Sequence, residues 1–246
     1  MKSNILLSIL IFTHLIFTQL LFGQKKPFTL ESQFELEYPN DAVISPNGKF
    51  AAYTVRKAEI EKARWNTQLY LLDVESKTTK QLTNNLSSIS NPKWMNESKS
   101  ILFLSNREYF DSSANEVKKG AKQLWSIPID GGEASILIAL KNEIDEYTIS
   151  PNGRMIAVIS ETELSEAEMK DKLKKEKSKN DEIVFPRQNP KKDVWLFNLI
   201  SKQSKKIASL DPGASNFKFS SKSDKLIYQT NYSGEYNDDQ KHDVWI

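Results

Sequence analysis

The sequence predicts an all-β fold, and three observations carry this prediction. A segment that combines a polar turn with an apolar strand recurs four times along the chain. Each copy is followed by a second segment that carries an aromatic residue, and the distance between the two segments is nearly constant apart from two insertions. Short strands repeated in this way are typical of β-propeller blades, which become stable by stacking on their neighbours.

The two clearest copies of the first segment are ISPNGKFAAYTV (residues 44–55) and ISPNGRMIAVIS (residues 149–160). WMNESKSILFLS (residues 94–105) and FSSKSDKLIYQT (residues 219–230) are weaker copies. A Pro-Asn-Gly turn suits this position because proline presets φ and glycine accepts a positive φ. The fourth copy has Asp224 where the other three have a basic residue, so it is the least faithful.

The second segment begins with a polar residue, followed by an aliphatic and then an aromatic one. It starts 24, 29, 44 and 24 residues after the first segment of its copy, so the second and third copies carry insertions of 5 and 20 residues. The aromatic positions are Tyr70, Trp125, Trp195 and Trp245. We therefore expect a partial β-propeller with three complete four-stranded blades and a truncated fourth. A β-sandwich and an irregular β-solenoid are the alternatives.

The expected blades cover about residues 41–85, 86–140, 141–209 and 210–246. The fourth copy stops at Ile246, four residues into its expected third strand. Propellers generally have about four to eight blades. We therefore expect an incomplete ring, whose missing blades come from a longer reading frame or from another chain.

The insertion in the third blade, ETELSEAEMKDKLKKEKSKNDE (residues 161–182), predicts a charged helix. Ser165 and Glu168 have the spacing of a capping box. A few apolar residues, Leu164, Ala167, Met169 and Leu173, lie among the charges. Charge runs of this kind are usually exposed, so we expect a solvated arm, with contact to another domain or subunit as the alternative. Residues 107–122 form a similar polar excursion in the second blade.

The first 23 residues predict an export signal. Lys2 is followed by an apolar run over residues 5–22, and the small residue Gly23 ends it. The run is nearly long enough for a membrane anchor, which is the alternative. Residues 24–40 are the expected lead-in to the propeller. The protein is thus expected to be exported to the periplasm or the extracellular space.

The composition excludes several classes of function. The chain of 246 residues has 34 basic and 32 acidic residues and a net charge of +2, so no strong field would recruit nucleic acid. The absence of cysteine excludes disulfides, thiolate metal sites and a cysteine nucleophile. Cleavage after residue 23 would remove His14 and leave His242 as the only imidazole.

The sequence contains no G-x-S-x-G nucleophile segment, H-E-x-x-H motif, phosphate-binding loop or dinucleotide fingerprint. The sequence therefore predicts no catalytic, cofactor-binding or metal-binding residue and no cofactor. The densest polar cluster comprises Asp238, Asp239, His242 and Asp243. We interpret it as a solvated acidic loop rather than a metal site.

Three other features have structural interpretations. Asp130 with Gly131 and Gly132 is expected to form a turn, because no helix follows it. Arg107 and Glu108 are the best candidates for lining a rim or channel, with a surface ion pair as an equal alternative. Four recurring tryptophans are expected to pack within the blades rather than to stack on a ligand. They are Trp94, Trp125, Trp195 and Trp245.

These segments together resemble the prolyl oligopeptidase family, especially its secreted bacterial dipeptidyl-peptidase and acylaminoacyl-peptidase branch. The resemblance covers about residues 28–246. It rests on the two ISPNG segments, SNRE after the second blade's strand, QLWSIPIDGGEAS, and the lysine-rich insertion leading to EIV and DVWLFNL.

The resemblance implies a propeller that covers an α/β-hydrolase domain and admits only short peptides. The serine, acid and histidine of that family lie C-terminal to the propeller, beyond the residues present here. The chain would thus be a non-catalytic part of a secreted serine peptidase. Its implied partners are short peptides for the full peptidase, and the hydrolase domain or other envelope proteins for the propeller. The alternative is a TolB-like periplasmic propeller that binds proteins without catalysis.

Overall fold

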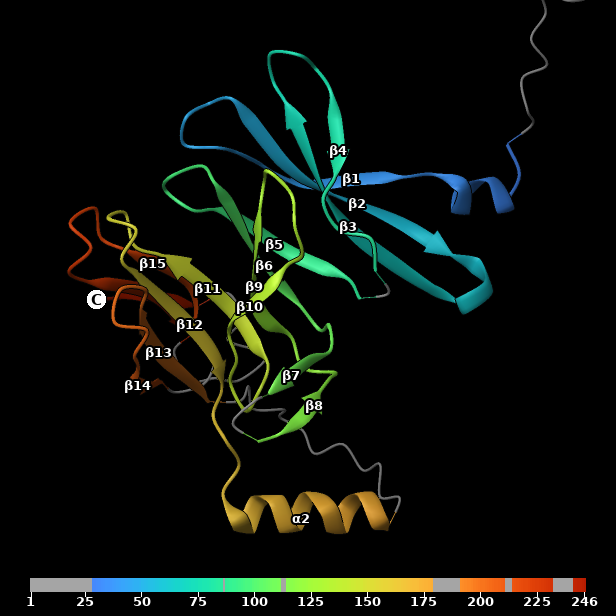
Figure 1. The fold of residues 1–246 in the computed structure, drawn as a ribbon. Coiled ribbons are helices and arrows are strands. Elements are labelled where there is room, and N and C mark those ends of the chain that lie inside the picture. Colours follow the sequence, from blue (N-terminus) through green and yellow to red (C-terminus); the bar gives the residue numbers. More distant parts are fainter. Residues whose placement is uncertain (1–27, 86, 112–113, 179–190, 211–213, 232–240) are drawn as a thin grey trace, which may run out of the picture. The chain divides into compact units, whose positions relative to one another are not determined.

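The computed structural model describes residues 28–85, 87–111, 114–178, 191–210, 214–231 and 241–246 (Figure 1). The chain divides into two units, Met1–Leu36 and Glu37–Ile246. The described part of the first unit contains a short 3-10 helix, η1 (Glu31–Glu35). Next to it, the Thr29 amide donates to Ser32 Oγ over 3.1 Å.

The second unit is built from antiparallel sheets that follow one another along the chain (Figure 1). Besides a two-stranded hairpin, the described residues form three four-stranded sheets and one three-stranded sheet, which confirms the all-β propeller fold. We call these sheets blades one to four. Blade one contains β1 (Tyr38–Ile44), β2 (Phe50–Glu59), β3 (Arg64–Asp73) and β4 (Thr79–Gln81). Blade two contains β5 (Ile89–Trp94), β6 (Ser100–Ser105), β9 (Gln123–Pro128) and β10 (Ser135–Ile138).

Blade three contains β11 (Ile144–Ile149), β12 (Met155–Glu161), β13 (Lys192–Asn198) and β14 (Ser204–Leu210). Blade four contains β15 (Ser215–Phe219), β16 (Leu226–Asn231) and β17 (His242–Trp245). A further 3-10 helix, η2 (Ile60–Lys62), connects β2 with β3. Blade one begins at Tyr38, inside the segment expected to be lead-in. The two repeated segments of the sequence correspond to the first turn and the third strand of each blade.

The repeated turns are closed by the same side-chain hydrogen bonds. In blade one, Ser45 Oγ donates to Asn47 Oδ1 over 2.7 Å, and the Phe50 amide donates to Ser45 Oγ over 3.0 Å. In blade three, Ser150 Oγ donates to Asn152 Oδ1 over 2.8 Å. The glycine of each turn has a positive φ, 72° at Gly48 and 69° at Gly153. A left-handed backbone at this position is the reason for glycine in the two faithful copies.

Blades two and four have serine at the glycine position, and these serines join neighbouring blades. Ser98 and Ser223 keep the left-handed conformation, with φ of 57° and 62°. The Asn47 amide donates to Ser98 Oγ, and the Asn152 amide donates to Ser223 Oγ, each over 3.1 Å. The serine hydroxyls thus supply bonds that glycine cannot make, and these bonds offset the cost of an unfavourable backbone conformation.

The contact between the turns of blades two and three is different. There Asn96 Nδ2 of blade two donates to the Pro151 carbonyl of blade three over 2.6 Å. The same amide nitrogen lies 2.9 Å from the position that a Cβ would take at Gly153. Gly153 is therefore required both by its backbone conformation and by the side chain of the preceding blade.

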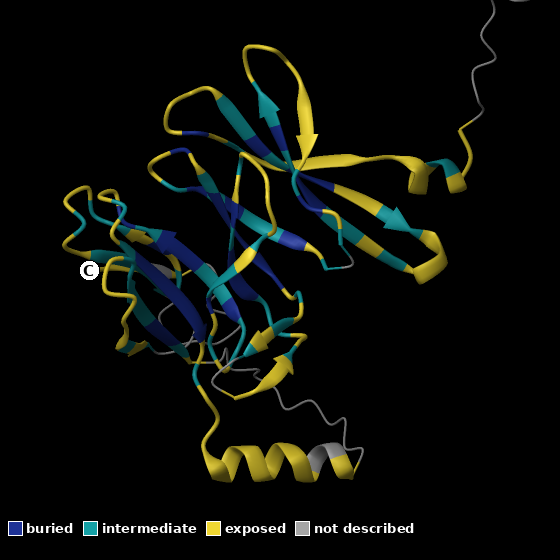
Figure 2. Ribbon diagram, in the orientation of Figure 1, coloured by how far each residue is buried: buried dark blue, intermediate teal, exposed yellow. Residues whose placement is uncertain are grey.

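Apolar side chains fill the spaces between adjacent blades. Figure 2 shows that the buried residues, in dark blue, lie on the strands of the blades. Between blades one and two, Leu69, Phe103 and Trp125 belong to one buried cluster. Between blades two and three, Leu102, Tyr147 and Val158 belong to a second. A third cluster, smaller than these two, joins blades three and four. Because each cluster takes side chains from two sheets, burial of apolar area stabilises the blades as a stack rather than singly.

The four tryptophans do not all have the expected role. Trp94 ends β5, the first strand of blade two, whereas Trp125, Trp195 and Trp245 lie on third strands. Trp94 and Trp125 are buried and donate to the backbone carbonyls of Val43 and Ser105. Trp195 packs against the cluster between blades two and three. Trp245 is exposed, because within the described residues β17 is the edge strand of its sheet.

In each of the first three blades, a buried polar residue lies two positions before the aromatic residue of the third strand. The two glutamines at this position hold the chain that leads to the next blade. Gln68 Nε2 donates to the carbonyls of Asn85 and Ser87. Gln123 Nε2 donates to the equivalent carbonyls of Leu140 and Asn142. Asp193 instead accepts from Ser209 Oγ and Thr162 Oγ1, over 2.6 and 3.0 Å. This repeated polar position therefore fixes how one blade leads into the next.

The two insertions leave the blades. The excursion in blade two forms a hairpin of β7 (Tyr109–Asp111) and β8 (Glu116–Lys118). The helix of blade three, α2, spans Glu166–Lys177 and is shorter than the expected 161–182. Glu161 belongs to β12, because it still pairs with Lys192 of β13, and residues 179–182 lie outside the described part.

The capping box at the start of α2 is confirmed. Ser165 Oγ donates to Glu168 Oε2 over 2.6 Å, and the Glu168 amide donates to Ser165 Oγ over 3.3 Å. Leu164, Met169 and Leu173 remain exposed, so they do not seat the helix on the blades (Figure 2).

Gly153 and Gly48 form a matched pair that isolates the bond between the turns of blades two and three. We expect Gly48→Ala to cost about 1–2 kcal/mol of unfolding free energy from the left-handed backbone alone. Gly153→Ala should cost about 1 kcal/mol more, because the new Cβ displaces the Asn96 amide from the Pro151 carbonyl. Urea denaturation of both variants measures the difference. Equal destabilisation would show that the bond between the two turns contributes nothing.

Candidate functional site

The first strands of blades two, three and four bring three charged side chains into one group. These are Lys93 on β5, Glu146 on β11 and Lys218 on β15. We call them the first-strand charge group. Each of the three strands has a bulge or irregularity in its pairing at this level. Asn91 and Asn216 have a left-handed backbone there, with φ of 53° and 56°. Bulges reorient side chains, so the backbone itself directs these residues.

Lys93 is held by Tyr147 of the next blade. Its ammonium donates to the Tyr147 carbonyl over 2.5 Å and lies 4.7 Å from the centroid of the Tyr147 ring. Tyr147 is fully buried, and its hydroxyl lies 2.7 Å from the Asn91 carbonyl and 2.9 Å from that of Leu102. Burial lowers the pKa of Lys93; the Glu146 charge opposes this shift, and Lys218 adds to it.

Glu146 links blade three to blade four. Its two carboxylate oxygens accept the backbone amides of Asn216 and Phe217, each over 3.1 Å. Burial raises the pKa of Glu146, and the nearby Lys93 charge and the two amide bonds oppose the rise. The charges of Glu146 and Lys218 thus both act on Lys93, across three blades. The group contains no nucleophile paired with a base, so its chemistry is binding and positioning rather than catalysis.

Arg107 and Glu108 lie on a different part of the blade from these charges. They follow β6, the second strand of blade two, and precede the β7–β8 hairpin. The Arg107 guanidinium lies over the ring of Trp125 at 5.3 Å and over that of Phe103 at 5.9 Å. Burial lowers the pKa of Arg107, and the charge of Glu133 opposes this. Arg107 therefore covers the core between blades one and two.

Glu108 is exposed and forms a long ion pair, 4.0 Å, with Lys119. Of the two interpretations of this pair of residues, the structure favours surface packing and ion pairing at the rim over lining the inner strands. The turn at Asp130 has the expected form, since Gly131 and Gly132 have positive φ of 127° and 105° between β9 and β10.

Hollows on the described surface include one beside the β7–β8 hairpin and one along α2. The first, of 330 Å³, lies beside the β7–β8 hairpin, with Tyr109, Asp111 and Lys118 on one side and Gln123 and Leu140 on the other. Two of its lysines are already paired: Lys118 with Glu116 and Lys141 with Glu163. The hollow thus offers no unpaired cluster that would point to a particular ligand.

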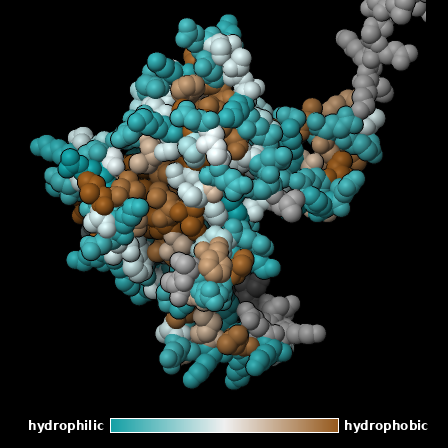
Figure 3. All heavy atoms as spheres, viewed as in Figure 1, coloured by the Kyte–Doolittle hydropathy of each residue, from teal (hydrophilic) through white to brown (hydrophobic). Residues whose placement is uncertain are grey.

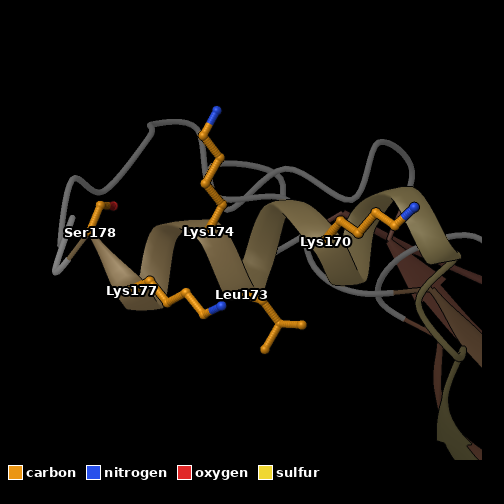
Figure 4. A pocket seen from close by; sticks show the side chains of 5 residues that line it. All are labelled: Lys170, Leu173, Lys174, Lys177 and Ser178. Atoms are coloured by element: carbon orange, nitrogen blue, oxygen red, sulfur yellow. The ribbon is translucent and has the colours of Figure 1, made fainter.

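The second hollow, of 600 Å³, runs along α2 (Figure 4). Its lining side chains, from Lys170 to Ser178, point in different directions from the helix and do not converge (Figure 4). In Figure 3, apolar surface spreads over blades two and three. It does not mark one deep pocket.

No cluster of three or more metal-ligating acidic or histidine side chains occurs within the described ranges. Asp238 and Asp239 of the predicted acidic loop lie outside the described residues, and Asp243 is exposed on β17. None of the described helices is long and apolar enough to cross a membrane. The apolar run of residues 5–22 also lies outside the described part.

The first-strand charge group was not predicted from the sequence. Lys93, Glu146 and Lys218 are separated by more than 50 residues from one another, and no shared motif surrounds them. The available signal was a charged residue within a strand that the repeat places next to another blade.

The amino-acid sequence is similar to two peptidases. Dipeptidyl-peptidase 5 of Porphyromonas endodontalis is 27% identical over 121 residues, which cover 49% of this chain and 16% of that protein. The uncharacterized peptidase YuxL of Bacillus subtilis is 22% identical over 234 residues, which cover 90% of this chain and 34% of that protein. The chain thus spans only a minor part of the length of either peptidase. No protein-family model matches the chain.

The fold is similar to that of the acylaminoacyl peptidase of Pyrococcus horikoshii. The TM-score is 0.59 at 11% identity, and the match covers 84% of this chain and 30% of that protein. At this identity the match shows the fold alone. Together, the sequence and fold similarities support a relationship to peptidases of the prolyl oligopeptidase type.

The pH dependence of the unfolding free energy should reveal the raised pKa of Glu146. Because its pKa in the folded chain is raised above the ordinary 4.5, folding favours its protonated form. We expect the unfolding free energy of the natural chain, relative to Glu146→Gln, to rise as the pH falls from neutral through the raised pKa toward 4.5.

Urea denaturation across this pH range measures the difference, and Glu97→Gln at an exposed carboxylate on the turn of blade two gives the background. Asp145 and Lys93 are the charged groups that act on Glu146, and they are the same in the natural chain and in Glu146→Gln. A difference that falls on acidification would show that the charged form of Glu146 is the stabilising one.

Proposed function

We propose that this chain is the non-catalytic propeller part of an exported serine peptidase of the prolyl oligopeptidase type. In this role the propeller admits short peptides to a hydrolase domain and excludes folded proteins. The similarity to peptidase YuxL, which extends over 90% of the chain, carries the proposal. The stacked blades support it, since they are the architecture found in the acylaminoacyl peptidase with the similar fold.

The structure suits a passive barrier. Buried clusters between all neighbouring blades, together with the hydrogen bonds between their turns, make the blades a rigid wall. A rigid wall selects by size, because a folded protein cannot follow a peptide through a narrow opening. In a peptidase of this type the acyl transfer belongs to a serine, histidine and acid on the hydrolase domain. In the proposed role, the propeller residues control which peptides reach the hydrolase domain and do not cleave bonds.

The first-strand charge group gives this barrier a polar lining in the proposed role. The innermost strands of propeller blades surround a central channel. Lys218 is exposed, whereas Lys93 and Glu146 are half-buried and held in place by their blade partners. A peptide passing these strands would therefore meet charges of both signs in fixed positions.

Export is the remaining part of the proposal. It is supported by Lys2 followed by the apolar run of residues 5–22. Dipeptides and other short peptides are the substrates that the proposed barrier would admit. The assignment of substrate to this chain rests on the proposed role alone.

An activity assay tests whether the propeller is non-catalytic. The purified 246-residue chain should not hydrolyse dipeptidyl or acylaminoacyl chromogenic substrates above the buffer rate, because the propeller supplies no nucleophile with a base. A catalytically competent acylaminoacyl peptidase serves as the positive control. Turnover that a serine-directed inhibitor abolishes would contradict the proposal.

Reading the coding DNA beyond codon 246 tests the peptidase assignment independently. We expect further blade repeats and then a segment with the G-x-S-x-G pattern. A few further blades followed by a stop codon, with no hydrolase segment, would instead favour a propeller of the TolB type that binds envelope proteins.

A further inference from the structure

Lys93 and Lys218 occupy the same position in their blades. Each directly follows the bulge of its first strand, where the pairing register shifts. The bulges themselves are alike, because Asn91 and Asn216 both have a left-handed backbone. The same backbone geometry therefore directs lysine side chains from two different blades.

The two lysines flank blade three. Blades one and three have the uncharged residues Val43 and Thr148 at the equivalent position. The first strand of blade three, β11, lies between β5 and β15 (Figure 1). From one side, the Lys93 ammonium donates to the Tyr147 carbonyl of β11. From the other side, Lys218 is close enough for its charge to act on Lys93. Two cations from separate blades therefore come together at β11.

The carboxylate of the first-strand charge group leaves both ammoniums without an ion pair. The two oxygens of Glu146 accept backbone amides of β15, from Asn216 and Phe217. Within the described ranges, no carboxylate lies at ion-pair distance from Lys93 or Lys218. Two ammoniums and one carboxylate give the group an excess of one positive charge.

Both ammoniums retain hydrogen-bond donors. An ammonium has three N–H donors, and Lys93 uses one of them for the Tyr147 carbonyl. Lys218 is exposed, and none of its donors bonds to a described residue. Burial lowers the pKa of Lys93 most, and the Lys218 charge lowers it further, against the opposing charge of Glu146. An anion between the two ammoniums would relieve their repulsion.

We propose that Lys93 and Lys218 bind a carboxylate of a short peptide that passes the first strands. One carboxylate oxygen accepts from each ammonium, and the two charge-assisted bonds hold the group over blade three. The carboxylate belongs to an acidic side chain or to the C-terminus of the peptide. The site lies on the proposed barrier, so its assignment rests on the proposed function. It adds a preference for acidic peptides over neutral and basic ones of the same size.

A carboxylate matches the charge of this group better than other peptide groups do. Its single negative charge neutralises the excess positive charge. A phosphate ester carries about 1.5 to 2 negative charges and would leave an excess of negative charge beside Glu146. A basic side chain would add to the repulsion between Lys93 and Lys218.

Binding of capped peptides to the whole 246-residue chain tests the proposal. The first probe is acetyl-Gly-Glu-Gly-amide, and acetyl-Gly-Gln-Gly-amide is its neutral counterpart of nearly the same shape. The second probe is acetyl-Gly-Gly-Gly with a free C-terminus, and its C-terminal amide is the neutral counterpart. The two pairs distinguish a side-chain carboxylate from a terminal one. Titration of the isotope-labelled chain, followed by nuclear magnetic resonance, measures each dissociation constant.

We expect at least one carboxylate peptide to bind at least about tenfold more tightly than its neutral counterpart, because two charge-assisted bonds are lost in the neutral one. Lys218→Gln should remove this preference without disturbing the core, since the side chain is exposed. Lys218→Arg keeps the charge and should retain part of the preference. Lys222→Gln, at an exposed position on the turn of blade four, is the matched control and should leave the preference unchanged.

The proposal is wrong if both members of each pair bind equally, or if neither carboxylate peptide binds. A preference that survives in Lys218→Gln would also overturn it. The same holds for a preference that Lys222→Gln removes to the same extent, because the overall charge of the chain would then be the cause. The coding DNA beyond codon 246 decides the peptidase assignment separately, so failure of the carboxylate site and failure of the proposed function are distinguishable.

Discussion

Stacking of sheets on sheets is the interaction on which this structure depends. Each sheet has apolar side chains on both faces, and a single sheet cannot bury either face by itself. The clusters around Phe103, Tyr147 and Phe217 each draw side chains from two sheets. Loss of one blade would therefore expose apolar area on both of its neighbours. Stability accumulates along the stack, as in other repeat proteins.

Polar contacts determine how the stack is aligned. Burial of apolar area is not directional, so it does not by itself fix how one sheet sits on the next. The turn bonds, the ties from Gln68 and Gln123, and the carboxylate of Glu146 supply that direction. These groups are buried or half-buried, which makes an unpaired partner costly and a misaligned blade unfavourable. The same features make the propeller rigid enough for the proposed role of a selective barrier.

The architecture could be predicted from the sequence because each blade repeats the same local sequence pattern. The two ISPNG turns, their weaker copies and the aromatic third strands marked the blades, and Ser165 with Glu168 marked the start of the helix. What could not be predicted depends on distance through space. Lys93, Glu146 and Lys218 meet only when three blades stack, and the aromatic packing of Arg107 requires the rings of Phe103 and Trp125 on adjacent strands. Trp245 was expected to pack within its blade, but within the described residues β17 is an edge strand and leaves Trp245 exposed.

The alternation of glycine and serine in the turns makes the structural repeat a pair of blades rather than a single one. Gly48 and Gly153 mark glycine turns, whose asparagine amides donate to the next blade, and Ser98 and Ser223 mark serine turns, whose hydroxyls accept these bonds. Excision of blade two alone would bring two glycine turns together, with neither a serine hydroxyl nor an asparagine side-chain amide between them. Removal of blades two and three together would leave a serine turn beside a glycine turn, as before. Such propellers should therefore tolerate the gain or loss of blades in twos more readily than singly.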